Sequence, residues 1–88
     1  MRPLPQSRPP PAPPPRGATL DVRPLLARGT EPFPLIRRRV DRLAAGGSLT
    51  VIAPFLPAPL IERLRAEGFG IALEHRPDGA WAVQLTRP

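Results

Sequence analysis

Proline constrains the fold of this chain more than any other residue, because it fills 16 of the 88 positions and is unevenly spread. Half of the prolines lie within residues 1–16, where only Met1, Leu4 and Ala12 have apolar side chains. So few apolar groups do not offset the entropy of ordering, roughly 1–2 kcal/mol per residue. The sequence therefore predicts a disordered proline- and arginine-rich tail over residues 1–17, largely polyproline II, and a single domain over residues 18–88.

Composition excludes several classes of site. All 13 basic residues are arginines, and with seven acids they give a formal net charge of +6. Arg2, Arg8 and Arg16 account for half of this charge, so the predicted domain is only mildly basic. The chain has no cysteine, which excludes a disulfide framework, a thiolate metal site and a thiol nucleophile.

No segment of the sequence is predicted to be a targeting signal or a membrane span. A secretory signal needs an apolar stretch of roughly 7–15 residues, and none follows Arg2. The longest apolar run, Val51–Ile61, contains three prolines and is far shorter than the ~20 residues that span a bilayer. We expect a cytoplasmic protein without contact to a membrane.

Local patterns predict four strands and two helices. Alternation predicts a strand over Thr19–Arg23, followed by a loop over Pro24–Gly29. A helix then begins at Pro32, capped by Thr30 or Glu31, and ends at Gly46-Gly47. Its predicted buried stripe is Phe33, Ile36, Val40 and Leu43.

The second half repeats this alternation of strand and helix. Ser48–Ala53 is a near-continuous apolar run, typical of a central strand. A second helix begins near Pro59 and ends at Gly68, with Leu60, Ile61 and Leu64 facing inward. Two alternating strands follow, with Phe69, Ile71 and Leu73 in one and Trp81, Val83 and Leu85 in the other, joined by a turn at Arg76–Gly79.

The element order β-α-β-α-β-β predicts an α+β fold. Strands joined through a helix lie parallel with a right-handed crossover, and the last two strands form an antiparallel hairpin. One apolar stripe on each helix favours a two-layer α/β sandwich, a four-stranded mixed sheet with two helices on one face. A core of this size is marginal, so we expect a monomer or a weak homodimer.

Three short motifs in this order resemble the TusA/SirA-like sulfur-carrier family. They are Leu20-Asp21-Val22-Arg23 in the first strand, Glu31-Pro32-Phe33-Pro34 at the first helix, and Gly47-Ser48-Leu49 leading into the second strand. The resemblance covers most of residues 18–86 and implies the same β-α-β-α-β-β fold. The chain resembles a cysteine-free branch, bacterial domains of unknown function.

The resemblance also shows what is missing. The position that matches the persulfide-carrying cysteine of the sulfur carriers is Glu31, and a carboxylate does not hold sulfane sulfur. The loop between Arg23 and Glu31 is longer than in the carriers. The segment Pro54–Leu60 replaces their polar stretch after the second strand. Sulfur relay through this position is therefore excluded.

Two interpretations of Glu31 remain open. It is either a capping carboxylate, paired with Arg23 or Arg28, or a hydrogen-bonding or metal-binding group at the former carrier position. For Asp21 and Arg23, fixing the loop is the favoured role, and binding is the alternative. His75 is the only histidine, and we interpret it as a solvated residue beside a turn. No metal site or cofactor is predicted.

One rim of the predicted sheet collects the candidate binding residues. Ligands of open α/β sheets bind at the carboxyl ends of the strands, where the first helix begins and the Phe55-Leu56 loop leaves the second strand. Phe55 and Leu56 either pack into the core or form an apolar patch for a partner. The full set of predicted binding residues is Asp21, Arg23, Glu31, Pro32, Phe33, Pro34, Phe55 and Leu56.

Arginines of the two helices offer a second surface. Arg37, Arg38, Arg39, Arg42, Arg63 and Arg65 form one basic face if the helices lie side by side. Such faces contact phosphates in nucleic-acid-binding proteins. Against this, acids interrupt the face, and Trp81 and Phe69 fall on the predicted core side rather than on a stacking platform.

The sequence thus predicts a non-catalytic binding or adaptor module whose partner is another protein. No Ser/His/Asp set and no glycine-rich phosphate loop is present, so we do not expect an enzyme. The alternative function is an RNA- or DNA-binding accessory domain that uses the arginine face. A small-molecule or metal-binding accessory at Glu31 is a third class.

Overall fold

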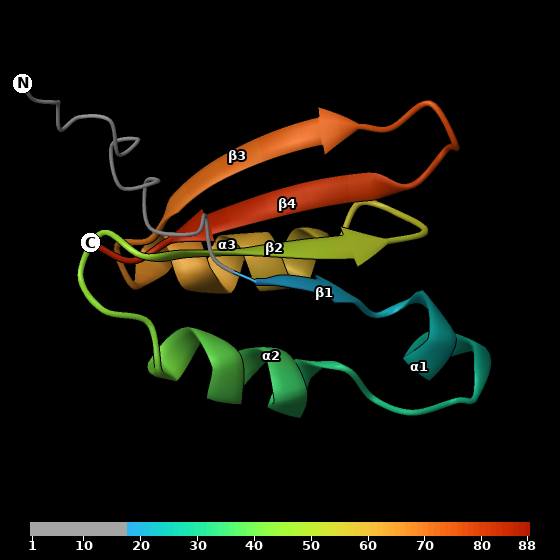
Figure 1. Cartoon of the computed structure of the whole chain (residues 1–88), viewed down its shortest axis with the longest axis horizontal. Helices are drawn as coiled ribbons and strands as arrows, with labels where there is room; N and C mark the ends of the chain where they lie inside the picture. Colours follow the sequence, from blue (N-terminus) through green and yellow to red (C-terminus); the bar gives the residue numbers. More distant parts are fainter. Residues whose placement is uncertain (1–17) are drawn as a thin grey trace, which may run out of the picture.

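A four-stranded mixed sheet with helices against one face forms the protein in the computed structural model, which describes residues 18–88 (Figure 1). The elements are, in order, β1 (Thr19–Asp21), α1 (Arg23–Ala27), α2 (Phe33–Asp41), β2 (Ser48–Ala53), α3 (Ala58–Ala66), β3 (Gly70–His75) and β4 (Trp81–Thr86). The predicted α+β class and element order are confirmed, with the short helix α1 added. The predicted tail, residues 1–17, lies outside the described residues.

The strands are arranged in the order β1-β2-β4-β3. β1 runs parallel to β2, with Leu20 opposite Val51, and β4 runs antiparallel to both β2 and β3. The parallel pair and the C-terminal hairpin were predicted from the sequence. β4 lies between β2 and β3, so that β2 has a hydrogen-bonded neighbour on each side and occupies a central position, as its apolar run predicted.

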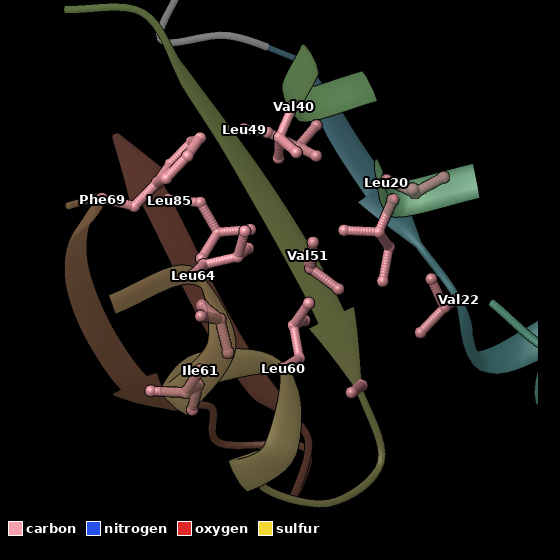
Figure 2. Close-up of a cluster of buried hydrophobic side chains, with 13 residues drawn as sticks. Leu20, Val22, Val40, Leu49, Val51, Leu60, Ile61, Leu64, Phe69 and Leu85 are labelled. Carbon is pink, nitrogen blue, oxygen red and sulfur yellow. The ribbon is translucent and has the colours of Figure 1, made fainter. Parts of the chain in front are cut away.

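One face of the sheet carries the core. Strand side chains from this face pack against α2 and α3 in a single cluster, comprising Leu20, Val22, Ile36, Val40, Leu49, Val51, Ala53, Leu60, Ile61, Leu64, Phe69, Val83 and Leu85. Figure 2 shows Leu60 and Leu64 of α3 turned toward the sheet. The predicted inward residues Ile36 and Val40 of α2, and Leu60, Ile61 and Leu64 of α3, are confirmed as buried. Phe33 and Leu43 are only partly buried, and Leu43 lies beyond the end of α2.

The boundaries of the first helical region differ from the prediction. The predicted loop after β1 is helix α1, in which Pro24 takes a first-turn position and Leu26 packs against the core. Helix α2 begins at Phe33 rather than Pro32, and neither Thr30 nor Glu31 caps it, because the cap position is occupied by Pro32 and no side chain bonds to the first turn. The capping interpretation of Glu31 is therefore wrong.

The last two strands also differ from the prediction in one respect. Leu73 was placed on the apolar face, but 46% of it is exposed, because the helices do not cover the outer edge of β3. Trp81 is only partly buried and stacks on exposed His75, with ring centroids 4.4 Å apart. The turn between the strands is confirmed, with Gly79 at a positive φ of 89° that favours glycine.

Within residues 18–88, no helix is both long and apolar enough to cross a membrane.

Candidate binding pocket

A pocket of about 350 Å³ opens where the carboxyl end of β2 meets the three helices. It is lined by residues of β2, the helices and the loops between them, namely Val22, Leu26, Glu31, Pro32, Phe33, Ile36, Val51, Ala53, Phe55, Pro57, Pro59, Leu60 and Arg63. This is the carboxyl end of the parallel pair β1–β2, the edge at which open α/β sheets bind ligands.

The floor of the pocket belongs to the hydrophobic core. Val22, Val51 and Ala53 are buried members of the core cluster and also line the pocket. The cavity therefore leads from the surface directly onto packed apolar side chains. Such a site takes an apolar group and excludes water from it.

Proline chemistry shapes the loop at the mouth. Pro57 has no N–H to donate, and the N–H of Ala58 donates to the carbonyl oxygen of Leu56 at 2.9 Å, which closes a tight turn before α3. This turn leaves Phe55 with 55% and Leu56 with 40% of their surfaces exposed. Two large apolar residues are thus held outside the core, as the patch interpretation of the sequence requires.

Two ionisable side chains line this otherwise apolar pocket. Glu31 is exposed and makes no hydrogen bond or ion pair within the part of the chain that the structure describes. The guanidinium carbon of Arg63 lies 5.4 Å from the centroid of the Phe33 ring, a cation–π contact. Arg63 Nε also lies 3.9 Å from Glu67 Oε2. One carboxylate, that of Glu31, and one cation, that of Arg63, therefore line the pocket.

The structure brings together four of the eight predicted binding residues. Glu31, Pro32, Phe33 and Phe55 line one pocket, and Leu56 is exposed beside Phe55 in the same loop. Pro34 is exposed in the first turn of α2, outside the lining. That these residues bind a partner stays a prediction.

Asp21 and Arg23 lie outside the pocket and bind each other. Arg23 Nη2 lies 2.7 Å from Asp21 Oδ2, and Arg23 Nη1 lies 3.3 Å from Asp78 Oδ2 in the β3–β4 turn. The side-chain and backbone hydrogen bonds from Arg23 hold the pKa of Asp21 below its usual value. Arg23 therefore connects the end of β1 to the β3–β4 turn. The suggested ion pair between Glu31 and Arg23 is wrong, because the guanidinium of Arg23 binds Asp21 and Asp78.

The arginine face is partly neutralised by acids. Arg37 lies between Asp41, at 2.7 Å, and Glu67, at 2.8 Å. The hydrogen bonds from Arg37 lower the pKa of both carboxyl groups. The contact with Glu67 shows that α2 and α3 lie side by side, as the nucleic-acid hypothesis requires. Four of the six arginines make no ion pair within residues 18–88: Arg38, Arg39, Arg42 and Arg65.

Nine of the thirteen residues that line the pocket were not among the predicted binding residues, and two of the nine, Leu26 and Arg63, were assigned to other parts of the fold. Leu26 was assigned to a loop, although a proline followed by two leucines is a signal for a short helix with an inward face. Arg63 was assigned only to the arginine face, and its stacking on Phe33 depends on how α2 and α3 pack, which no local pattern encodes. Among the described residues, no group of three or more His, Asp or Glu side chains is placed to hold a metal ion.

Comparison with known proteins places the chain at the level of a family. No curated protein and no solved structure matches it. A family model described as an uncharacterized conserved protein matches residues 19–87, which is nearly the whole of the described fold. The chain therefore belongs to the uncharacterized conserved protein family DUF2249.

Proposed function

We propose that this protein is a non-catalytic adaptor module that binds another protein through the pocket between β2 and the helices. The observation that carries the proposal is an apolar cavity of about 350 Å³ beside Phe55, which is 55% exposed. Protein interfaces are built around apolar anchors that fill such pockets. The expected anchor is a large aliphatic or aromatic side chain of the partner, seated on Val22, Val51 and Ala53.

The ionisable groups of the lining support binding rather than catalysis. General acid–base chemistry needs positioned partners, and Glu31 and Arg63 make no hydrogen bond to each other. At the rim of an apolar site they are suited to orient a partner segment that carries charges of both signs beside its anchor.

The resemblance to sulfur carriers is part of this proposal. We infer a TusA/SirA-like ancestry from the three motifs and from the position of Glu31 before the first long helix. Persulfide relay requires a thiolate, and the chain has no cysteine. In this proposal, the end of the fold that carries Glu31 binds a protein partner instead of transferring sulfur.

Nucleic-acid binding through the arginine face is the alternative function. Its support is the contact between Arg37 of α2 and Glu67 at the end of α3, together with Arg38, Arg39 and Arg65, which make no ion pair within residues 18–88. A protein of this kind loses affinity steeply as salt rises, because each phosphate contact releases counterions.

Two variants separate these functions. The full-length protein, Phe55→Asp and the triple variant Arg37→Ala/Arg38→Ala/Arg39→Ala are each used to capture partners from a lysate, and the partner is then purified for binding isotherms. Phe55→Asp is expected to weaken binding at least about tenfold, because a carboxylate replaces an apolar contact worth roughly 1.4 kcal/mol or more. The triple variant is expected to bind like the wild type.

Ala44→Asp is the control, since it adds the same charge at an exposed position in the loop before β2, outside both the pocket and strand β3. It is expected to retain the partner. Loss of the partner in the triple variant, with Phe55→Asp unaffected and nucleic acid in the captured material, contradicts the adaptor proposal.

A further inference from the structure

Strand β3 has a free side that nothing in the described part of the chain covers. It is the edge strand next to β4, and five of its six residues are exposed, with Ile71 partly buried (Figure 1). The opposite edge, β1, is only three residues long. β3 is therefore the longer template for pairing with another strand.

The direction of the free backbone groups follows from the turn. The N–H of Arg76 donates to the carbonyl oxygen of Ala80 at 2.8 Å, so this pair is a hydrogen-bonded one. Hydrogen-bonded and non-bonded pairs alternate along an antiparallel ladder. The backbone groups of Ile71, Leu73 and His75 therefore point away from β4, toward the free edge.

Apart from the charge of Glu74, this edge lacks the features that prevent pairing. The six residues of β3 include no proline, lysine or arginine, and they pair with β4 one to one, without a bulge. Leu73 stands at the middle of the outward set and is 46% exposed. An apolar side chain in this place loses contact with water when a second strand pairs beside it.

We propose that two copies of this chain pair through β3, antiparallel, with Leu73 on the two-fold axis. Leu73 then lies opposite Leu73 of the second copy, and Ile71 lies opposite His75 of the second copy. In this register, each outward N–H and C=O of Ile71, Leu73 and His75 has a backbone partner. The two sheets join into one continuous eight-stranded sheet, because four strands come from each copy.

Self-complementarity points to a second copy of the chain rather than to a different protein. The register places Glu74 opposite Ala72 of the second copy, so the acidic side chains do not face each other. A two-strand contact is smaller than a standard interface of roughly 1,600 Å², so the dimer is weak and depends on concentration. The pocket lies at the carboxyl end of β2 and stays open in the dimer, which makes this inference independent of the proposed function.

Sedimentation velocity on the full-length protein, from roughly 10 μM to 1 mM, tests the pairing. The wild type is expected to shift from monomer to dimer across this range. Leu73→Arg is expected to raise the dissociation constant at least about tenfold, because two cations then face each other on the axis. Ala72→Arg adds the same charge one residue away, where it faces Glu74 of the second copy, and is expected to keep or tighten the dimer.

Cross-linking through an introduced cysteine reports the register even when the dimer is sparsely populated. Leu73→Cys is expected to form an intermolecular disulfide, because Cα atoms of a hydrogen-bonded pair lie about 5.5 Å apart, within disulfide range. Glu74→Cys, displaced from the axis, is the control and is expected to cross-link far more slowly. A wild type that stays monomeric at about 1 mM, with no Leu73→Cys disulfide, overturns the proposal. So does a dimer that Leu73→Arg leaves unchanged, or a β3 edge occupied by a different protein.

Discussion

Leu64 and Leu73 differ in burial, the property that most determines how much a leucine side chain contributes to the free energy of unfolding. Leu64 has no exposed surface and lies on the inward face of α3, whereas Leu73 is 46% exposed at the sheet edge. The sequence alone assigned both to the apolar interior. Helical spacing was sufficient for Leu64, but the exposure of Leu73 depends on how far the helix layer reaches across the sheet.

The first prediction follows from this difference. Leu64→Ala is expected to lower the free energy of unfolding by about 2–5 kcal/mol, since it removes buried methyl groups and leaves a cavity. Leu73→Ala is expected to change it by less than about 0.5 kcal/mol at a protein concentration that keeps the chain monomeric. Urea denaturation followed by circular dichroism measures both. Equal losses for the two variants contradict the burial described for the core.

Asp78 gives the second prediction, a dependence of stability on pH. The backbone N–H of Ala80 and the side chain of Arg76 lower the pKa of Asp78 from 3.8 to about 2. A carboxyl group whose pKa falls on folding stabilises the fold above its unfolded pKa, and this stability is lost as pH falls through the folded value. The pKa values of Asp21, Asp41 and Glu67 are lowered too, so their contributions add in the same direction.

Thermal unfolding between pH 7 and pH 2 checks this second prediction, with roughly constant stability above pH 5 and a fall below pH 4 expected. Asp78→Asn retains an acceptor for the N–H of Ala80 but loses the charge, so its stability is expected to be lower at pH 7 and to fall less steeply in acid. A parallel pH profile for the wild type and Asp78→Asn shows that Asp78 does not contribute.

At the scale of helices and strands, the sequence predicted the type and order of the elements better than it predicted the segments that join them. Both long helices have a period of 3.6 residues, three strands alternate with a period of two, and β2 is a near-continuous apolar run, and these patterns gave the fold class. The misassigned region lies between Val22 and Phe33, where α1 replaces the expected loop. A helix of five residues has little periodicity to detect, and its stability comes from packing of Leu26 against the core.

The candidate site was predicted in part for the same reason. Glu31, Phe33 and Phe55 were assigned to one rim because parallel strands and their following loops share an edge, a consequence of topology. The contribution of α1 to the wall of the pocket, through Leu26, was not predicted. The absence of a cap at Glu31 also could not be read from the sequence, because Pro32 and Pro34 leave several starting points for the helix.

The third prediction concerns the contact between the two long helices. Arg37 binds Glu67 across the gap between α2 and α3 and is 29% exposed. Arg37→Ala is expected to lower stability by about 0.5–1 kcal/mol, because the pairs are near the surface and screened by solvent. Arg38→Ala, which removes an exposed arginine with no ion pair within residues 18–88, is the control and is expected to have no effect. The difference should shrink in 1 M salt, and a difference that persists there contradicts an electrostatic origin.

At the scale of the whole molecule, the proposed binding surfaces lie apart. The pocket with Phe55 lies at the carboxyl end of β2, and the β3 edge lies on the far side of β4 (Figure 1). Taken together, the two proposals imply that a dimer paired through β3 presents two equivalent pockets, one from each copy. Two linked sites raise the apparent affinity for a partner that carries two anchors.

The fourth prediction follows from this separation. If the partner is itself dimeric, Leu73→Arg is expected to weaken the apparent affinity by about tenfold or more through loss of bivalency, while the affinity for a single immobilised anchor peptide is unchanged. Surface plasmon resonance at low and high partner density measures the two cases. Equal affinity of the wild type and Leu73→Arg at high density contradicts a bivalent assembly.

Photo-cross-linking from position 55 shows whether the pocket is in contact with a protein partner in the cell. Phe55 is replaced by a benzoyl-phenylalanine photo-cross-linker in living cells, and Ala44, exposed in the loop before β2 at the opposite end of that strand, is the control position. One dominant protein adduct is expected from position 55, and none from position 44. Adducts to nucleic acid, or the same adducts from both positions, would contradict the adaptor proposal.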